Sequence, residues 1–154
     1  RSPAGIFELG GVDGTAPVPK KKRSMPYRRI TPRDMWVDDP SSPLYNQHFV
    51  LKHDPVTPWE FKQQMKLNDY AHSLKLFIRH NAAGDQGHPV AGGGSSIFFH
   101  IWRRDGQAPT AGCTAMSEEN LRAMIAWLDP SKHPLYVLLP SREYLRLRKA
   151  WGLP

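Results

Sequence analysis

The stretch from Ser95 to Met116 constrains the chain most, because it joins a run of strand-forming residues to the only cysteine in the sequence. Residues 96–102 are rich in aromatic and β-branched side chains, which favours a β-strand. This strand carries His100, and Cys113 follows it after a polar loop. A thiol becomes a good nucleophile when a base takes its proton, and Gly112 lets the backbone bend beside the sulfur. Cys113 and His100 are therefore candidates for a nucleophile and its general base.

A lone cysteine also has a simpler interpretation. Free cysteines are among the most buried residue types, and they commonly pack as small hydrophobic side chains. A cysteine and a histidine alone do not identify a catalytic site, so the surrounding sequence has to distinguish the two interpretations.

Two motifs surround this pair. The first is SPAGIF at residues 2–7, and the second runs from GSSIFFH at 94–100 through PTAGC at 109–113 to LDP at 128–130. This pattern resembles the catalytic domain of the L,D-transpeptidase (YkuD-like) family. Its members carry a Thr/Ser-Pro-x-Gly-x-Phe element, and further along a histidine ahead of a Ser/Thr-x-Gly-Cys signature. The resemblance covers about residues 1–140.

The resemblance implies a mostly β fold with a few short helices, built as a β-sandwich or barrel-like catalytic domain. It implies that Cys113 is the nucleophile, that His100 is the general base, and that backbone N–H groups around Gly112 form the oxyanion hole. The implied substrate is a peptidoglycan stem peptide, which forms a thioester with the cysteine. An amine of a neighbouring stem then resolves the thioester into a cross-link. No cofactor is expected.

Six further residues are candidates for substrate contact. Segment 36–46, WVDDPSSPLYN, is similar to a stretch that related sequences often carry and is expected to border the cleft, although Asp-Asp-Pro also opens ordinary turns. Aromatic side chains in the cleft walls would keep water from a thioester, and the glycine-rich residues 82–94 suit a flap or turn over it. The six candidates are Trp102, Tyr45, Asn46, Asp39, Ser96 and Thr110.

Two places depart from the family pattern. Many members have a second histidine directly before the glycine, where this chain has Ala111, and an arginine shortly after the cysteine, where it has Thr114 and Ala115. The type of link is therefore open. The family includes enzymes that form a 3,3-type link between two diaminopimelates, enzymes that form a 1,3-type link from L-Ala to diaminopimelate, and enzymes that attach proteins to the wall.

Other functions fit the same sequence. Water could replace the amine, which describes an L,D-carboxypeptidase or an endopeptidase acting on stem peptides or on protein–peptidoglycan links. The chain could also be a non-catalytic, basic wall-binding module. A net charge of +7 attracts any polyanion, and residues 20–23 (KKKR) form a short basic run. Because no aromatic-rich nucleic-acid module accompanies this run, we expect no nucleic-acid partner.

Composition sets the broad class. Fifteen prolines and twelve glycines in 154 residues predict a loop-rich β architecture rather than a helical bundle. No apolar run is long enough to cross a bilayer, and a lone thiol without His-Glu-x-x-His predicts no metal site.

We expect residues 1–154 to form a single catalytic domain lacking its N-terminal strands and signal segment. We further expect it to be exported to the periplasm or cell envelope without stable membrane insertion.

Periodicity predicts the elements. The stretch 73–79 alternates and should place one face in the core, 134–140 has the composition of a buried strand, and 141–151 reads as a basic helix that docks on the body. Strands are expected over 6–9, 27–30, 35–37, 48–52, 73–79, 96–102 and 134–140, and helices over 59–66, 117–128 and 141–151.

Overall fold

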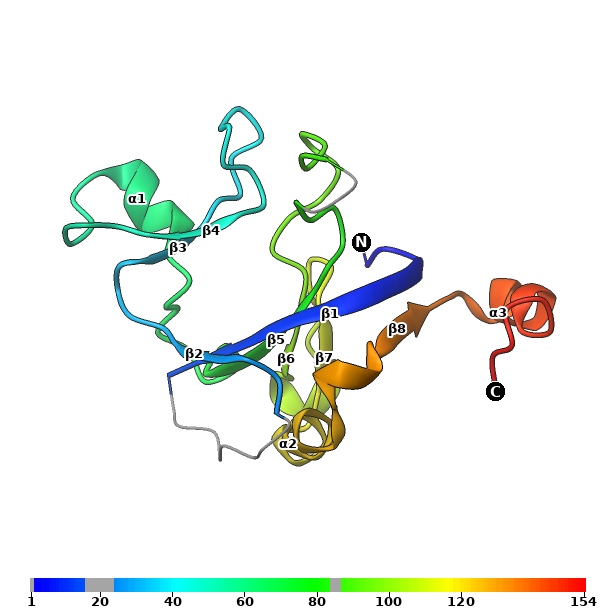
Figure 1. The fold of residues 1–154 in the computed structure, drawn as a ribbon. Coiled ribbons are helices and arrows are strands. Elements are labelled where there is room, and N and C mark those ends of the chain that lie inside the picture. Colours follow the sequence, from blue (N-terminus) through cyan, green and yellow to red (C-terminus); the bar gives the residue numbers. More distant parts are fainter. Residues whose placement is uncertain (1, 16–23, 84–86) are drawn as a thin grey trace.

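The computed structural model describes residues 2–15, 24–83 and 87–154. A six-stranded sheet with the strand order β2-β1-β5-β6-β7 forms its centre, and β8 pairs with the first half of β1 (Figure 1). A separate two-stranded sheet, β3-β4, lies beside helix α1. The strands are β1 Gly5–Gly14, β2 Tyr27–Arg29, β3 Asp34–Trp36, β4 His48–Val50, β5 Leu74–Ile78, β6 Phe98–Ile101, β7 Thr114–Met116 and β8 Leu135–Leu138, and the helices are α1 Pro58–Gln63, α2 Glu118–Trp127 and α3 Ser141–Leu147, with 3₁₀ turns at Arg104–Gly106 and Pro130–Lys132.

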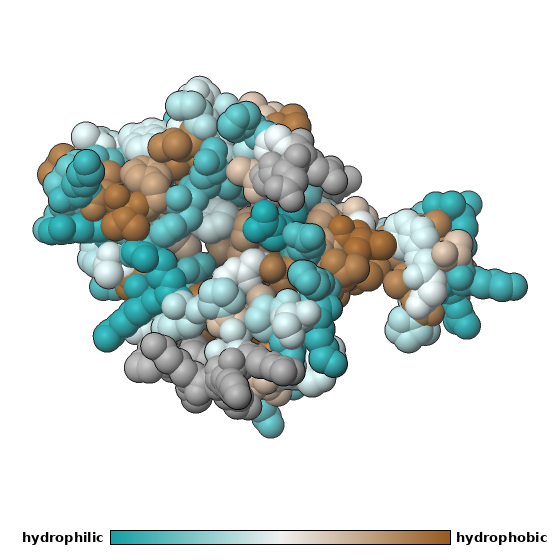
Figure 2. Space-filling model, in the orientation of Figure 1, coloured by the Kyte–Doolittle hydropathy of each residue, from teal (hydrophilic) through white to brown (hydrophobic). Residues whose placement is uncertain are grey.

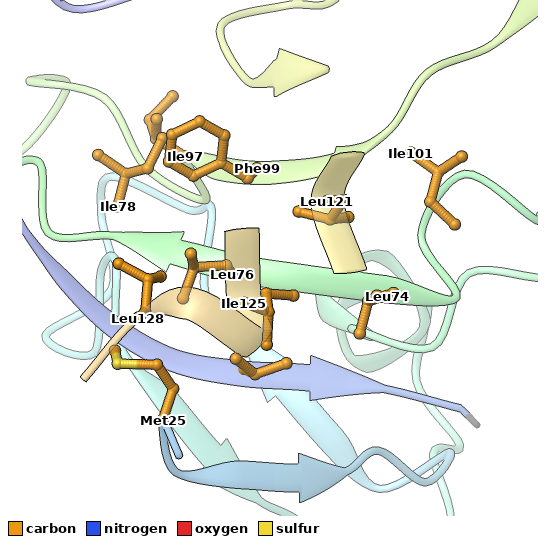
Figure 3. Packing of buried hydrophobic residues seen from close by; sticks show 11 residues of the cluster. Met25, Leu74, Leu76, Ile78, Ile97, Phe99, Ile101, Leu121, Ile125 and Leu128 are labelled. Carbon is orange, nitrogen blue, oxygen red and sulfur yellow. The ribbon is translucent and has the colours of Figure 1, made fainter. Parts of the chain in front are cut away.

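Helix α2 covers one face of the sheet. Ser117 caps the helix by accepting a hydrogen bond from the N–H of Asn120, as the sequence predicts. Its apolar side chains then pack on the residues of β5 and β6 that point toward the helix (Figure 3). This main hydrophobic core contains Val12, Met25, Leu74, Leu76, Ile78, Ile97, Phe99, Ile101, Leu121, Ile125 and Leu128.

The second face of the sheet is covered as well. Side chains alternate along a strand, so Lys75 and Phe77 of β5 and Phe98 and His100 of β6 point away from α2. A smaller apolar cluster with Ile30 and Met65 packs on this face. Every residue of β5 and β6 is therefore buried. The expectation that β5 has only one face in the core is wrong, because the layer of β3, β4 and α1 covers the other face.

Asp34 holds that second layer together. Its side chain is 0% exposed and accepts hydrogen bonds from Arg28 Nε at 2.5 Å, from the backbone N–H and hydroxyl of Thr31, and from His48 Nε2 at 2.9 Å. Burial alone would raise the pKa of Asp34, but these hydrogen bonds outweigh it and lower the pKa to about 2. The carboxylate therefore stabilises the fold at neutral pH.

Replacing Asp34 with alanine should destabilise the protein by about 3 kcal/mol at pH 7, because the hydrogen bonds that Arg28, Thr31 and His48 donate to its buried carboxylate are lost. A depressed pKa contributes stability above the unfolded-state value and loses it as pH falls toward the folded-state value. The deficit should therefore shrink between about pH 4 and pH 2, as urea unfolding at several pH values would measure. Asp54→Ala is the control, since Asp54 forms an exposed pair with Arg33 and should change stability by less than about 1 kcal/mol. An equal loss of unfolding free energy in the Asp34→Ala and Asp54→Ala variants would contradict the stabilising role of Asp34.

Strand β1 is longer than predicted. It continues through Gly10 and Gly11, where the sequence suggests a strand end and a turn, and its register with β5 shifts between Leu9 and Val12. The reason is a tertiary contact, because a Cβ at Gly10 would lie 2.6 Å from Cδ1 of Phe77. Glycine is therefore required by close packing here, and it does not end the strand.

The C-terminal segment differs most from expectation. Leu135 of β8 is 59% exposed, so β8 is not the buried strand that its composition predicts. Helix α3 lies away from the sheet rather than on it, and Trp151, expected to dock, is 42% exposed (Figure 1). Figure 2 shows hydrophobic residues gathered where the body meets α3, around a cavity of about 580 Å³ lined by β8, α3 and Leu153.

Candidate active site

The pairing of β6 with β7 places Cys113 and His100 on one face of the sheet. These strands are parallel, and Phe99 lies opposite Thr114 while His100 lies opposite Ala115. Continuing this register one residue back sets Cys113 opposite Phe98. His100 is two residues after Phe98 and so shares its face, about 6.6 Å further along the strand. The predicted pair is thus brought to the same side of the sheet, away from α2.

Backbone groups of the segment leading into β6 surround the sulfur. The thiol of Cys113 donates to the carbonyl oxygen of Ser96 over 3.4 Å, and Ser96 itself has a left-handed φ of 55°. The side chain also packs on the cluster that contains Phe98. On the other side, the hydroxyl of Thr110 donates to the carbonyl oxygen of Cys113 over 2.7 Å. The cysteine is therefore held from both its backbone and its side chain.

His100 is oriented by a backbone carbonyl. Its Nδ1 donates to the carbonyl oxygen of Ile101 over 2.7 Å, which leaves Nε2 as the acceptor nitrogen of the ring. The residue is only 2% exposed. Burial lowers the pKa of His100, because the imidazolium form is poorly solvated there. A neutral imidazole with a fixed tautomer is the state that a general base needs.

Burial also affects the protonation state of the Cys113 thiol. It raises the pKa of Cys113, while a hydrogen bond from the backbone of Phe98 and the positive charges of Lys75 and Arg103 oppose that rise only in part. The protein therefore holds a neutral thiol and a neutral imidazole on the same sheet face rather than a thiolate–imidazolium pair.

We expect alkylation of Cys113 by iodoacetamide to rise with pH to a midpoint above that of an ordinary thiol, since only the thiolate reacts. The same protein unfolded in urea is the control, because it contains the same single cysteine in water. A folded-state midpoint at or below the unfolded one would show that the folded protein stabilises the thiolate, as in an ion pair with His100.

A pocket of about 190 Å³ opens beside the sulfur. Its walls come from the β6 side of the sheet and from the layer of β3 and α1 above it. Most of its polar lining is cationic or neutral. The lining residues are Trp36, Asp38, Lys62, Gln63, Gln64, Met65, Leu67, His72, Lys75, Ser96, Phe98 and Cys113.

A row of polar side chains crosses the buried face of the sheet below this pocket. Asp13 of β1 lies opposite Lys75 of β5, and Lys75 lies opposite His100 of β6. Lys75 is 4% exposed, and its ammonium donates to the carbonyl oxygen of Met65 over 3.0 Å. Burial raises the pKa of Asp13 to about 6 despite the opposing charge of Lys75. The row places a buried positive charge next to the candidate base.

Of the six predicted substrate contacts, only Ser96 lines the pocket with Cys113. Asn46 is buried and bonds Trp36, the N–H of Ser96 and two carbonyl oxygens, so it supports the pocket wall from behind. Asp39 accepts bonds from Ser41 and from the indole of Trp59 in a turn. Thr110, as described above, holds the backbone of Cys113.

The two aromatic candidates lie outside the pocket. Tyr45 lines a separate hollow of about 310 Å³ together with Pro43 and His88. Trp102 follows β6, where its N–H donates to Met116 and its ring lies over Gly106. Gly112 is buried directly before the cysteine.

The predicted flap is tied to its neighbours in the described parts of residues 82–94. The side chain of Asn81 bonds both Val90 and the carbonyl oxygen of Gly94, and His80 bonds the carbonyl oxygen of Gly93. Residues 84–86, and the basic run at 20–23, lie outside the described residues.

Two pocket residues were not singled out from the sequence. Lys75 occupies an alternating strand position that reads as solvent-facing, and His72 precedes the same strand. The only local signal for His72 is Asp69 three residues earlier, which bonds its ring nitrogen at 2.8 Å. A carboxylate three residues before a histidine is a weak pattern on its own. Only the packing of the sheet shows that His72 lines the pocket.

The comparison with protein families decides the affiliation. The model of the L,D-transpeptidase catalytic domain (YkuD) matches residues 1–137. This chain belongs to the L,D-transpeptidase catalytic-domain family. The family resemblance drawn from its motifs is thereby confirmed, and the mostly β fold with few short helices agrees with it. No curated protein and no solved structure matches the chain significantly.

Two features of the described residues bear on membrane and metal binding. Among the described residues, no helix has the length and apolar character needed to span a membrane. In the same part of the chain, no group of three or more His, Cys, Asp or Glu side chains is arranged to hold a metal ion.

Proposed function

We propose that this protein is a peptidoglycan L,D-transpeptidase that forms cross-links through a thioester on Cys113. The observation that carries the proposal is the position of Cys113 at a pocket, on the sheet face that also holds the oriented, neutral imidazole of His100. Family membership supplies the class of reaction and substrate. The proposal places the described residues in one catalytic domain that acts in the periplasm or cell envelope.

The first half-reaction transfers the donor stem peptide to the enzyme. His100 Nε2 takes the thiol proton as the sulfur of Cys113 attacks the donor amide carbon, which forms the C–S bond. Backbone N–H groups at Gly112 and Cys113 are the proposed donors to the oxyanion, because they lie beside the attacking sulfur. The C–N bond then breaks, and the leaving amine takes the proton from His100. The product is a thioester.

The second half-reaction transfers the acyl group to an acceptor. An amine of a neighbouring stem, such as that of diaminopimelate, attacks the thioester carbon, and the C–S bond breaks to restore the cysteine. Ser96 borders the sulfur and is the predicted contact that we retain for the donor chain. The other five predicted contacts do not line the pocket in this proposal. Asn46 and Thr110 support its walls, and any substrate contact made by Tyr45, Trp102 or Asp39 lies outside it.

The positive charge of the pocket is consistent with this class of substrate. Lys62 and Lys75 line it, and stem peptides carry free carboxylates. Burial lowers the pKa of Lys75, and a carboxylate brought beside it would favour its ammonium form. This arrangement supports a peptide donor with an anionic end rather than a neutral one.

Incubation of the purified protein with defined muropeptides tests the function. Product masses separate amine transfer, which gives dimers, from hydrolysis, which gives shortened monomers. Fragmentation of the dimers then distinguishes a 3,3-type from a 1,3-type link. Dimers formed by the wild type would support the proposal. Shortened monomers alone would identify a carboxypeptidase or endopeptidase instead, and unchanged substrate would favour a wall-binding module.

A further inference from the structure

A second imidazole lies beside the candidate catalytic pair. The ring of His72 packs against the ring of His100 with centroids 4.7 Å apart and an interplanar angle of 34°. His72 also lines the pocket that contains Cys113. It precedes β5, the strand that neighbours β6, so two different segments bring the two rings together.

The tautomer of His72 is set by an ion network. Its Nδ1 lies 2.8 Å and 3.0 Å from the two carboxylate oxygens of Asp69, and Oδ1 of the same carboxylate accepts a hydrogen bond from the backbone N–H of His72. Arg103 donates to the same carboxylate over 2.5 Å. Burial alone would raise the pKa of Asp69, but these bonds outweigh it and lower it to about 2, so the group is ionised at neutral pH. An ionised carboxylate accepts, so Nδ1 carries the proton and Nε2 is the unprotonated nitrogen.

Proton balance in the second half-reaction leaves one proton that a second base would remove from the acceptor. The acceptor amine arrives as an ammonium ion, whereas attack on the thioester needs its lone pair. Thioester plus ammonium gives amide plus thiol plus one proton. His100 can receive one of the two protons that leave the nitrogen and return it to the sulfur of Cys113. The other proton has to leave by a second route, either directly to water or through another base.

We propose that His72 is this second base, with Nε2 taking the first proton from the acceptor ammonium before the C–N bond forms. The resulting imidazolium is stabilised by Asp69 and releases its proton to water, which restores the starting state. The inference rests on the proposed transpeptidase function and adds a catalytic residue to its acyl-transfer step.

The charges that face His72 are consistent with this role. Asp69 and Arg103 contact its Nδ1 side, with Arg103 Nη2 at 3.3 Å, and His100 and Lys75 act from the sheet. Burial lowers the pKa of His72, hydrogen bonding and charge from Asp69 oppose that effect, and positive charge at His100 or Lys75 would reinforce it. The ring is therefore neutral when the acceptor arrives.

The test separates the two half-reactions. Donor stem peptide alone is mixed with enzyme, and thioester formation is followed by the mass of the intact protein. The acceptor amine is then added at several pH values between about 6 and 10, and the rate of amide formation is measured. The variants are His72→Gln, which keeps a polar side chain, and His72→Phe, which keeps a ring against His100. His53→Gln is the control, because His53 is an exposed histidine that faces Glu60 at 3.6 Å.

We expect both His72 variants to form the thioester at a rate within about threefold of wild type. We expect their amide formation at pH 7 to fall by about 100-fold, the usual contribution of a general base. The deficit should shrink toward pH 10, where the amine loses its proton without help. His53→Gln should match the wild type throughout.

Three results would overturn the inference. Amide formation at the wild-type rate in both His72 variants would show that no second base acts there. An equal loss in both half-reactions, independent of pH, would show that His72 is only structural. Absence of any thioester on the wild-type enzyme would instead refute the proposed function on which the inference rests.

Discussion

Replacing Cys113 with alanine should reduce cross-link formation by at least about 1,000-fold, because no other side chain in the pocket supplies a thiolate nucleophile. Cys113→Ser should lose nearly as much, since a serine hydroxyl has a far higher pKa than a thiol and His100 is a weak base for it. The measurement is the initial rate of dimer formation from defined muropeptides, followed by chromatography and mass spectrometry.

Stability provides the control for the cysteine variants. Cys113 is only partly buried and packs at the edge of the smaller apolar cluster, so both substitutions should change the free energy of unfolding by no more than about 1.5 kcal/mol. Ser41→Ala, in an exposed turn far from the sulfur in the sequence, should keep full activity. Dimer formation by folded Cys113→Ala at more than a tenth of the wild-type rate would refute a covalent mechanism.

Replacing His100 with glutamine should lower the acylation rate by about 10²- to 10⁴-fold at pH 7. The reason is that Cys113 is a neutral thiol there and needs a base during attack. Because the pKa of the thiol is raised, the variant should recover only at pH values above the titration of an ordinary thiol. In the wild type, the acid limb of the pH profile should lie below the ordinary imidazole pKa, since burial lowers the pKa of His100.

The effect of the His100 variants on folding has to be separated from the loss of the general base. His100 is almost fully buried, so His100→Gln should be compared with His100→Phe, which fills the ring space and lacks an acceptor nitrogen. Both should lose acylation, whatever their unfolding midpoints. If His100→Gln acylates at the wild-type rate at pH 7, then another group removes the thiol proton, and His100 has a structural role.

Local patterns predicted much of the central fold. The aromatic, β-branched run that ends at His100 forms β6, and Ser117 with its following apolar spacing forms α2. Both succeed because the deciding information lies within a few residues: strand propensity in one case, a cap and a helical period in the other. The return of Cys113 to the edge of this strand followed from the loop between them, which is long enough to bring the two together.

Tertiary contacts explain what those patterns missed. Gly10 looked like the end of a strand, and only its contact with the ring of Phe77 shows why a glycine is required there. Lys75 looked exposed because the layer that covers it comes from residues that are distant in the sequence. His72 carries no recognisable motif, and its meaning depends on the ring of His100 in a neighbouring strand. Trp102 and Tyr45 were chosen as aromatic cleft walls, but neither lines the pocket beside Cys113, and Tyr45 lines a separate hollow.

The most direct test of a thioester on Cys113 is the mass of the intact protein after brief exposure to a donor stem peptide without acceptor. We expect an added mass equal to the donor minus its leaving group, localised to Cys113 by fragmentation and lost when an acceptor amine is supplied. Turnover of the donor with no adduct on this cysteine, or full turnover after the cysteine has been alkylated, would contradict the mechanism.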